Sequence, residues 1–416
     1  MKWLLVGYMW FAYVLNHADR QVVYTLFPAL QREFGYSDTM LGMTGALFLW
    51  VYGLCSPAAG IFGDRFPKRY LVAGSIAVWS AFTILSGLSP NGTFLLVCRA
   101  LLGVSESMFM PAGFALMAAA HGPETRSKAI AIFATGQMVG VATGGSLSGY
   151  VAEHLHWRAS FFILGSIGIL FAFPMWRFLK RLPPDVVGEK ASLVGFTSLF
   201  KIPSLLVVTG FIAIGTFGMF LVYTWLPTFL YDKFHLGLAR AGFEASVYPQ
   251  IGSAIGLLTG GALADHYYRR NASSRFWIAA AGFLFGAPAI YLIGQSATLD
   301  FTRIAAIAFG FCHGFIASNQ VPCAYEVVPP QLRATTIGLL NLVGGAVSGL
   351  APYLGGLSRK TIGVDRLMGF TAILMLTAAA LIVYGIARHL ARDQERVKLS
   401  LNASGQAETG GATRSV

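Results

Sequence analysis

The chain has 416 residues, of which 55% are hydrophobic and 12% are charged, and it contains 48 glycines. A soluble domain carries about 25% charged residues, so this composition excludes an ordinary water-soluble enzyme and predicts a polytopic membrane protein. The formal net charge of +12 would suit a nucleic-acid-binding protein, but the positions of the basic residues indicate another role for it.

Apolar stretches long enough to cross a bilayer, about 20 residues each, recur along nearly the whole chain. We predict an all-α fold of twelve spans: an N-terminal six-helix bundle at 1–180, a cytoplasmic linker at 181–202 and a C-terminal six-helix bundle at 203–391. Residues 392–416 contain few large apolar side chains and are expected to form a disordered cytoplasmic tail. The predicted spans are 3–30, 40–62, 70–88, 93–118, 128–152, 158–180, 203–231, 243–264, 275–296, 302–325, 334–357 and 366–390.

The basic residues are distributed unevenly between the two sides of these spans. Twenty Lys and Arg residues fall on the side of the N-terminus and eight on the other side. Cytoplasmic loops carry the excess of Lys and Arg in membrane proteins, so we expect a multi-pass protein of the cell's inner membrane with both termini in the cytoplasm. The basic excess is then topological, and no nucleic-acid partner is expected.

Four ionisable residues lie inside two otherwise apolar spans: Asp19 and Arg20 in the first, Arg99 and Glu106 in the fourth. A charge at membrane depth costs about 2.5 to 3.5 kcal/mol, and such residues usually face a partner or a watery pathway. Arg99 and Glu106 are two helical turns apart and project from one face, whereas Asp19 and Arg20 point about 100° apart. One of the latter pair can therefore meet the fourth span while the other faces a cavity.

With all four groups ionised the cluster is neutral, which permits its burial. A proton on Asp19 or Glu106 leaves a charge of +1, and an organic anion bound at Arg20 restores neutrality. Loss of a cationic neighbour favours protonation of a carboxylate in apolar surroundings, so proton and anion would each favour binding of the other, as reciprocal linkage requires. A static salt-bridged staple between the two spans is the alternative interpretation.

Two loops, after the second and the eighth spans, repeat one pattern of a glycine, an aspartate four residues later and a terminal basic pair. Two such halves predict a binding site between them at the midplane. We interpret the repeated loops as a breakable latch on the cytoplasmic face, because glycine permits close helix approach and aspartate can hold a helix N-terminus and a basic residue. A basic turn that only fixes topology is the alternative. The predicted gating residues are Gly60, Asp64, Arg65, Lys68, Arg69, Asp265, Arg269 and Arg270.

The first of these loops resembles the Gly-x-x-x-Asp-Arg-x-Gly-basic-basic signature of the major facilitator superfamily, with Pro67 in place of the second glycine. The run 16–20, Asn-His-Ala-Asp-Arg, resembles the Asn-x-x-Asp-Arg motif of its anion:cation symporters and of its spinster family, and 99–106 is similar to an Arg-x-x-x-Gly-x-x-Glu pattern that both share. The run 52–57 resembles the sugar-acid, or hexonate, branch of the symporters, whereas 269–288 is more similar to spinster proteins.

The resemblance to hexonate symporters implies site roles for individual residues. Arg20 would clamp the substrate anion, Asp19 and Glu106 would carry the proton beside Arg99, and Tyr52 would donate a hydrogen bond to the substrate. From their polarity within apolar spans, Gln137 and Asn341 are expected to bind substrate hydroxyl groups. Interhelical hydrogen bonding is the alternative for both.

The sequence thus predicts a secondary active transporter that carries a small organic anion, such as a sugar acid, together with a proton by alternating access. We expect it to work in the bilayer as a monomer, with no cofactor other than the coupling proton. The alternative is a spinster-like, proton-linked transporter of a lysolipid or another amphiphile, and multidrug efflux is a weaker option. No nucleophile, metal cluster or cofactor motif indicates an enzyme, and the four cysteines lie within predicted spans as packing residues.

Overall fold

The computed structural model describes residues 1–182, 196–268, 270–397 and 399, and it leaves the side chains of residues 60–65, 123, 127, 196, 330 and 334 outside the description. The first eight helices are α1 (Lys2–Thr25), α2 (Phe27–Phe34), α3 (Asp38–Arg65), α4 (Lys68–Gly87), α5 (Gly92–Ser107), α6 (Phe109–Ala120), α7 (Pro123–His154) and α8 (Trp157–Leu179). They are followed by α9 (Phe196–Leu199), α10 (Pro203–Phe234), α11 (Leu238–Tyr268), α12 (Ser274–Gln295), α13 (Leu299–Val327), the 3₁₀ turn η1 (Pro330–Leu332), α14 (Arg333–Ser358), α15 (Val364–Gly385) and the π-helical turn η2 (Ile386–Leu390).

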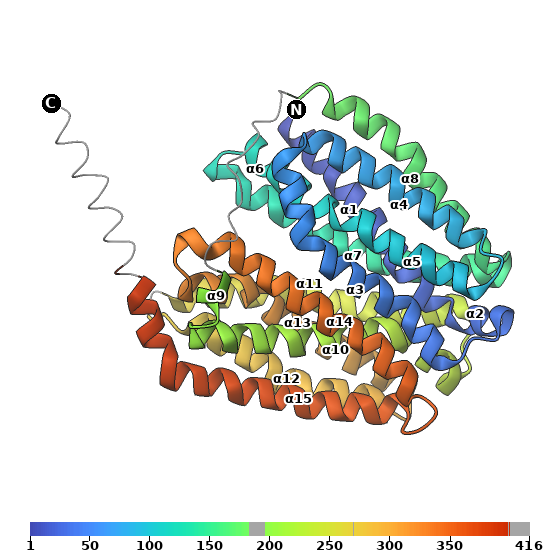
Figure 1. The fold of residues 1–416 in the computed structure, drawn as a ribbon. Coiled ribbons are helices and arrows are strands. Elements are labelled where there is room, and N and C mark those ends of the chain that lie inside the picture. Colours follow the sequence, from blue (N-terminus) through green and yellow to red (C-terminus); the bar gives the residue numbers. More distant parts are fainter. Residues whose placement is uncertain (183–195, 269, 398, 400–416) are drawn as a thin grey trace.

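The helices gather in two groups that follow the order of the chain (Figure 1). Helices α1 to α8 form one group and α10 to α15 the other, and the two groups meet along α3 and α14 and along α7 and α11. In each half the helices run back and forth between two faces. We call the face that carries residues 35–37, 235–237 and 359–363 the far face, and the face that carries the start of α1 and the end of α15 the termini face.

Ten helical stretches of the described residues are long and apolar enough to cross a membrane. Helices α1 and α11 are also long, at 24 and 31 residues, but they are not among the ten. The reason lies in their sequences, since α1 contains Asp19 and Arg20, and α11 is rich in glycine and serine and contains Pro249 and Gln250. With these two, the described helices make the twelve predicted passes.

The fourth pass is one span in the sequence but two helices in the structure. Helix α5 ends at Ser107 and α6 begins at Phe109. The cause is Pro111, whose ring has no N–H to donate and clashes with the carbonyl four residues earlier, at Ser107. The break follows directly after Glu106, so this carboxylate lies in the last turn of α5.

The two halves contact each other mainly toward the far face. Helices α3 and α14 run antiparallel, and a Cβ atom added to Gly356 would lie 2.3 Å from the backbone oxygen of Asp38. Farther along, a Cβ on Gly53 would lie 3.0 Å from the Cα of Gly345. Only glycine allows backbones to approach this closely. One turn beyond Gly345, toward the termini face, Asn341 is exposed.

Helices α7 and α11 repeat this arrangement on the other side of the molecule. A Cβ on Gly149 would lie 2.3 Å from the backbone oxygen of Leu238, and Gly145 packs against the buried side chain of Ser246. These contacts also lie near the far face, because they involve the end of α7 and the start of α11. The structure therefore holds its halves together at the far face.

The expected boundary of the tail is wrong. Residues 391–397 continue as helix after α15 and η2, and Asp393 is 3% exposed because it accepts a hydrogen bond from the backbone N–H of Ser204 at 3.0 Å. Most of this segment is polar, and it is held by Asp393, which caps the start of α10, and by Val397, which is buried. Residues 400–416 and most of the expected linker lie outside the described residues.

Candidate functional site

An ion pair joins the first and fourth passes. The Arg20 Nε atom of α1 donates to the Glu106 Oε2 atom of α5 at 2.7 Å. The Glu106 side chain is 0% exposed, whereas the Arg20 side chain retains 13% exposure. The arginine is therefore the member of the pair that a solute approaching between the halves meets first.

Two aromatic rings of α3 support the Arg20 guanidinium. Its Cζ atom lies 4.6 Å from the centre of the Tyr52 ring and 5.0 Å from that of Phe48. The Phe48 ring also lies 5.0 Å from the Cζ atom of Arg99. Cation–π attraction favours both contacts, and the ring separates two like charges. Sequence analysis did not identify Phe48, although it stands one helical turn before Tyr52 and so shares a face of α3 with it.

The other two charged residues are bonded mainly to their surroundings and not to each other's side chains. The Asp19 carboxylate accepts a hydrogen bond from the Thr83 hydroxyl of α4 at 3.1 Å. Arg99 donates to the backbone oxygens of Asp19 and Thr44, each at 3.4 Å. Asp19 and Arg99 are 3% and 1% exposed. They fix α1, α3, α4 and α5 around the pair of Arg20 and Glu106.

Gly103 permits this assembly. It lies between Arg99 and Glu106 on α5, and a Cβ atom there would be 2.7 Å from the backbone oxygen of Phe48 and 3.1 Å from the backbone nitrogen of Tyr52. Any side chain would push α5 away from α3. The glycine thus brings the two aromatic rings and the two arginines into contact.

All four charged groups keep polar atoms that make no hydrogen bond with the described residues. These atoms are Asp19 Oδ1, Glu106 Oε1, Arg20 Nη2 and Arg99 Nη2. Buried polar groups are normally satisfied, so a buried cluster with spare donors and acceptors has capacity to exchange partners.

Of the two predicted hydroxyl-binding residues, the structure places one near the cluster. Gln137 of α7 accepts a hydrogen bond from the Tyr13 hydroxyl at 3.4 Å, and Tyr13 belongs to α1, two turns before Arg20. Asn341 of α14 is exposed and forms no hydrogen bond or ion pair with the four charged residues within the described part of the chain. From the same half as Asn341, Tyr223 instead reaches α1, since its backbone oxygen accepts from the Gln21 amide at 3.2 Å.

An ionic bridge closes the far face, and sequence analysis did not identify it. Arg359, directly after α14, donates to the Asp38 carboxylate of α3 at 2.6 Å and also to Asp232 of α10. Asp38 belongs to the N-terminal group of helices, whereas Arg359 and Asp232 belong to the C-terminal group. A second link joins the halves nearby, where the Glu153 carboxylate accepts from the backbone N–H of Ala239 at 2.8 Å.

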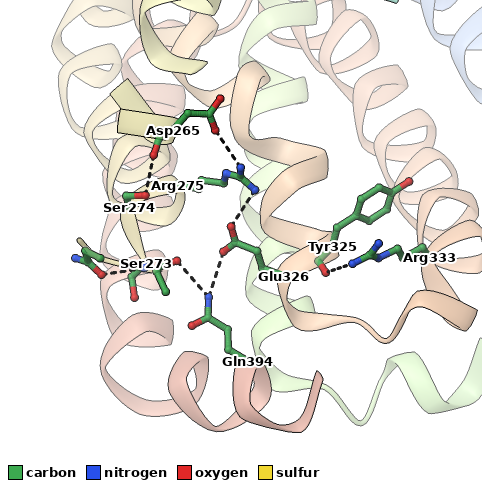
Figure 2. Close-up of polar contacts among 11 residues, drawn as sticks. Asp265, Ser273, Ser274, Arg275, Tyr325, Glu326, Arg333 and Gln394 are labelled. Carbon is green, nitrogen blue, oxygen red and sulfur yellow. Dashed lines mark hydrogen bonds and ion pairs between the residues drawn. The ribbon is translucent and has the colours of Figure 1, made fainter. Parts of the chain in front are cut away.

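The latch predicted in the C-terminal half has a different composition from the expected one (Figure 2). Asp265 pairs with Arg275 at 3.0 Å, and Arg275 also pairs with Glu326 of α13 at 3.1 Å. Gln394, in the helical segment after η2, donates to the same Glu326 at 3.2 Å. The predicted partner Arg270 is exposed, and Arg269 lies outside the described residues. The arginine that pairs with Asp265 is therefore Arg275, in the first turn of α12.

The corresponding loop of the N-terminal half is described only in part. The side chains of Gly60, Asp64 and Arg65 lie outside the described residues, and the structure shows the ends of α3 and α4 on either side of the turn. Lys68 and Arg69 open α4, and the Arg69 guanidinium lies 5.7 Å from the Tyr70 ring.

Comparison with known proteins decides the family. The description of the Major Facilitator Superfamily matches residues 9–352. The chain belongs to the major facilitator superfamily. It is therefore a polytopic helical membrane transporter and not an enzyme, and the predicted family and fold class are confirmed. Within its described residues, no group of three His, Cys, Asp or Glu side chains is placed to hold a metal ion.

Two relatives align with nearly the whole of this superfamily member. It is 26% identical over 408 residues to an MFS-type efflux pump of Mycolicibacterium smegmatis, covering 95% of this chain and 93% of the relative. It is 25% identical over 420 residues to the D-galactonate transporter of Escherichia coli, covering 92% and 93%. A solved bacterial homologue of the human lysosomal transporter Spinster, in an inward-facing and occupied conformation, has the same fold, with a TM-score of 0.80 and 19% identity over 93% of this chain and 97% of that one.

Proposed function

We propose that this transporter carries a small organic anion, of the sugar-acid class, together with a proton. The observation that carries the proposal is the ion pair of Arg20 and Glu106, in which the partly exposed guanidinium is held on two aromatic rings while its Nη2 atom has no hydrogen-bond partner in the described residues. A planar guanidinium binds a carboxylate through two parallel hydrogen bonds. Full-length similarity to a D-galactonate transporter supports the choice of anion.

In the proposed cycle, the substrate carboxylate replaces Glu106 at the Arg20 guanidinium. Glu106 then lies buried without its cation, and it takes a proton because an uncompensated buried carboxylate is unfavourable. Tyr52, whose ring lies against Arg20, and Gln137, which is hydrogen-bonded to Tyr13 of the same helix as Arg20, bind the hydroxyl groups of the substrate. When proton and substrate leave on the other side, the pair of Arg20 and Glu106 forms again.

We further propose that both termini face the cytoplasm of the inner membrane, that the protein works as a monomer of two six-helix halves, and that the far face is extracytoplasmic. The basic residues concentrate on the termini face, and the bridge of Arg359 to Asp38 joins the halves at the far face. On this orientation the structure corresponds to the state that is closed toward the outside.

The test is uptake by purified protein in liposomes with an acidic outer buffer. Radiolabelled D-galactonate, a hexuronate and a lysophospholipid are offered separately, with and without a protonophore. We expect accumulation of a sugar acid that the protonophore abolishes, and none with Arg20→Ala at equal reconstitution. Transport of the lysophospholipid alone would assign the protein to the amphiphile carriers, and uptake that ignores the proton gradient would overturn the coupling.

A further inference from the structure

Helices α12 and α15 lie side by side on the outer side of the C-terminal group of helices (Figure 1). A membrane-facing groove runs between them. Its volume is about 510 Å³, within the range of about 300 to 1,000 Å³ for pockets that bind small molecules. Its walls below the rim are apolar, with Pro288 and Tyr291 from α12 and Phe370, Ile373 and Leu376 from α15. None of the residues of the transport site lines it.

The groove is open to the surroundings of the protein and not to the space between the halves. Phe370, Ile373 and Tyr291 are 55%, 60% and 48% exposed. Both helices are long and apolar enough to cross a membrane, so the medium beside these side chains is lipid. An occupant of the groove is therefore a component of the bilayer.

The length of the groove matches one leaflet. It extends along α15 from Arg366 to Leu376, ten residues, which at about 1.5 Å per residue is about 15 Å. Half of the hydrocarbon core of a bilayer, about 30 Å in total, has the same thickness. One acyl chain can thus lie along the whole groove without leaving its leaflet.

The rim at the far face is polar and cationic. Arg366 stands in the first turn of α15 and Gln295 is the last residue of α12, and both are exposed at the same end of the groove. Arg366 forms no ion pair with any described residue. The neighbouring Asp365 lies in another pocket, beside Lys233 and Arg359. A guanidinium with unused donors at the level of the headgroups suits a phosphate.

We propose that this groove is a binding site for one anionic diacyl phospholipid of the far-face leaflet, with an acyl chain between α12 and α15 and its phosphate on Arg366 and Gln295. Gly369 keeps the groove wide, since it lines the wall and its nearest neighbour beyond its own helix would lie 3.7 Å from an added Cβ atom, on the Tyr291 ring. A larger side chain at this position has room to fold but occupies the groove.

The test is native mass spectrometry of the purified full-length protein in a mild detergent, titrated with dioleoyl phosphatidylglycerol or with dioleoylglycerol, which has the same chains without phosphate. We expect one tightly retained phosphatidylglycerol and at least tenfold weaker retention of dioleoylglycerol. Arg366→Gln should weaken phosphatidylglycerol binding at least fivefold, Arg366→Lys should restore part of it, and Gly369→Leu should remove the bound lipid.

The matched control is Lys360→Gln, which removes an exposed positive charge of the adjacent loop and should leave retention unchanged. Equal retention by all variants, or equal retention of the two lipids, would overturn the proposal. A protein dimer in place of a lipid adduct would also overturn it, by assigning the groove to a second copy of the chain. Circular dichroism of each variant identifies any that fails to fold. In that case the retention of phosphatidylglycerol by Arg366→Lys is compared with that of the wild type.

Discussion

Arg359 and Asp38 lie 2.6 Å apart across the boundary between the two halves, although 321 positions separate them in the sequence. Their side chains are 19% and 5% exposed. The bridge joins the start of α3 to the end of α14, the two helices whose glycines touch farther down. For the halves to part at the far face, this bridge must break.

Arg359→Gln should therefore favour separation at the far face. The substitution leaves Asp38 and Asp232 without their shared cation. The closed far face should lose stability by an amount between about 1 kcal/mol, as for an exposed pair, and about 3 to 5 kcal/mol, as for a fully buried one. A reporter cysteine, Ser246→Cys, is placed at a buried position against Gly145, with Cys55 changed to Ser. Its labelling by a maleimide should be faster in Arg359→Gln and unchanged in Lys360→Gln. Equal labelling in both would show that the bridge does not hold the face closed.

Arg20→Lys should weaken substrate binding although it keeps the positive charge. Lysine loses the planar fork and the stacking on Tyr52 and Phe48. We expect a dissociation constant at least tenfold higher, or about 1.4 kcal/mol, measured by calorimetry with the transported acid. Arg240→Lys, at an arginine that is 60% exposed, serves as the control. Unchanged affinity of Arg20→Lys would exclude bidentate binding at this position.

Glu106→Gln should remove the dependence of uptake on pH. If Glu106 must take a proton as substrate displaces it from Arg20, wild-type uptake falls as the outer pH rises, because the proton is then less available. The amide resembles the protonated acid at every pH, so the variant should exchange substrate across the membrane without accumulating it. Glu33→Gln, which changes a carboxylate that pairs with Arg158 near the far face, should keep the wild-type pH profile. A pH-dependent uptake retained in Glu106→Gln would move the proton site to another group.

Gly103→Ala should destabilise the protein by about 1 to 3 kcal/mol, the usual cost of forcing atoms into a filled interior. The added carbon would lie 2.7 Å from the backbone oxygen of Phe48. Gly74→Ala is the control, since no atom lies within 4 Å of a Cβ atom there and alanine is favoured over glycine inside a helix by about 0.5 to 1 kcal/mol. Thermal unfolding in detergent should give a lower Tm than the wild type for Gly103→Ala but not for Gly74→Ala. Equal Tm values for the two variants would show that α3 and α5 can move apart without a loss of stability.

Arg275→Ala should loosen the termini face of the C-terminal half. It removes the cation that joins Asp265 and Glu326, and Glu326 is 8% exposed. A loss of about 1 to 3 kcal/mol is expected, above that of an exposed pair, with faster hydrogen exchange at the ends of α11 and α13. Arg270→Ala, at the exposed position that the sequence pattern favoured, should change neither the stability nor the hydrogen exchange. A larger effect of Arg270→Ala than of Arg275→Ala would instead support Arg270 as the latch residue that the sequence pattern predicted.

Much of this fold could be predicted from the sequence, because the length of the apolar stretches and the charges between them determine where a bilayer can accept each helix. A contact of either Asp19 or Arg20 with the fourth span was also predictable, since a charge inside an apolar span needs a partner, but the sequence did not determine that this residue is Arg20. The helical period placed Arg99 and Glu106 on one face of their span. It did not determine that Asp19 turns to Thr83 of α4.

Contacts between distant segments account for what sequence analysis missed. Phe48 is an ordinary core phenylalanine by its pattern, and its place between two arginines depends on the approach of α3 to α5 at Gly103. The latch in the C-terminal half was predicted from a loop pattern, but its strongest members come from the next helix and from α13. Asn341 was expected among the substrate ligands; the structure shows it exposed on α14, and its substrate-binding role stays a prediction.

The capping of Ser204 by Asp393 has a practical consequence for imaging a protein of this size. Residues 391–397 are tied to the start of α10 and, through Gln394, to α13, so a rigid helical fusion joined in frame at Val397 would inherit a fixed orientation relative to the bundle. Such a fusion would supply the alignment marker that a small, detergent-embedded particle otherwise lacks in electron cryomicroscopy. A deletion that removed Asp393 would also remove the hydrogen bond that holds this segment to α10.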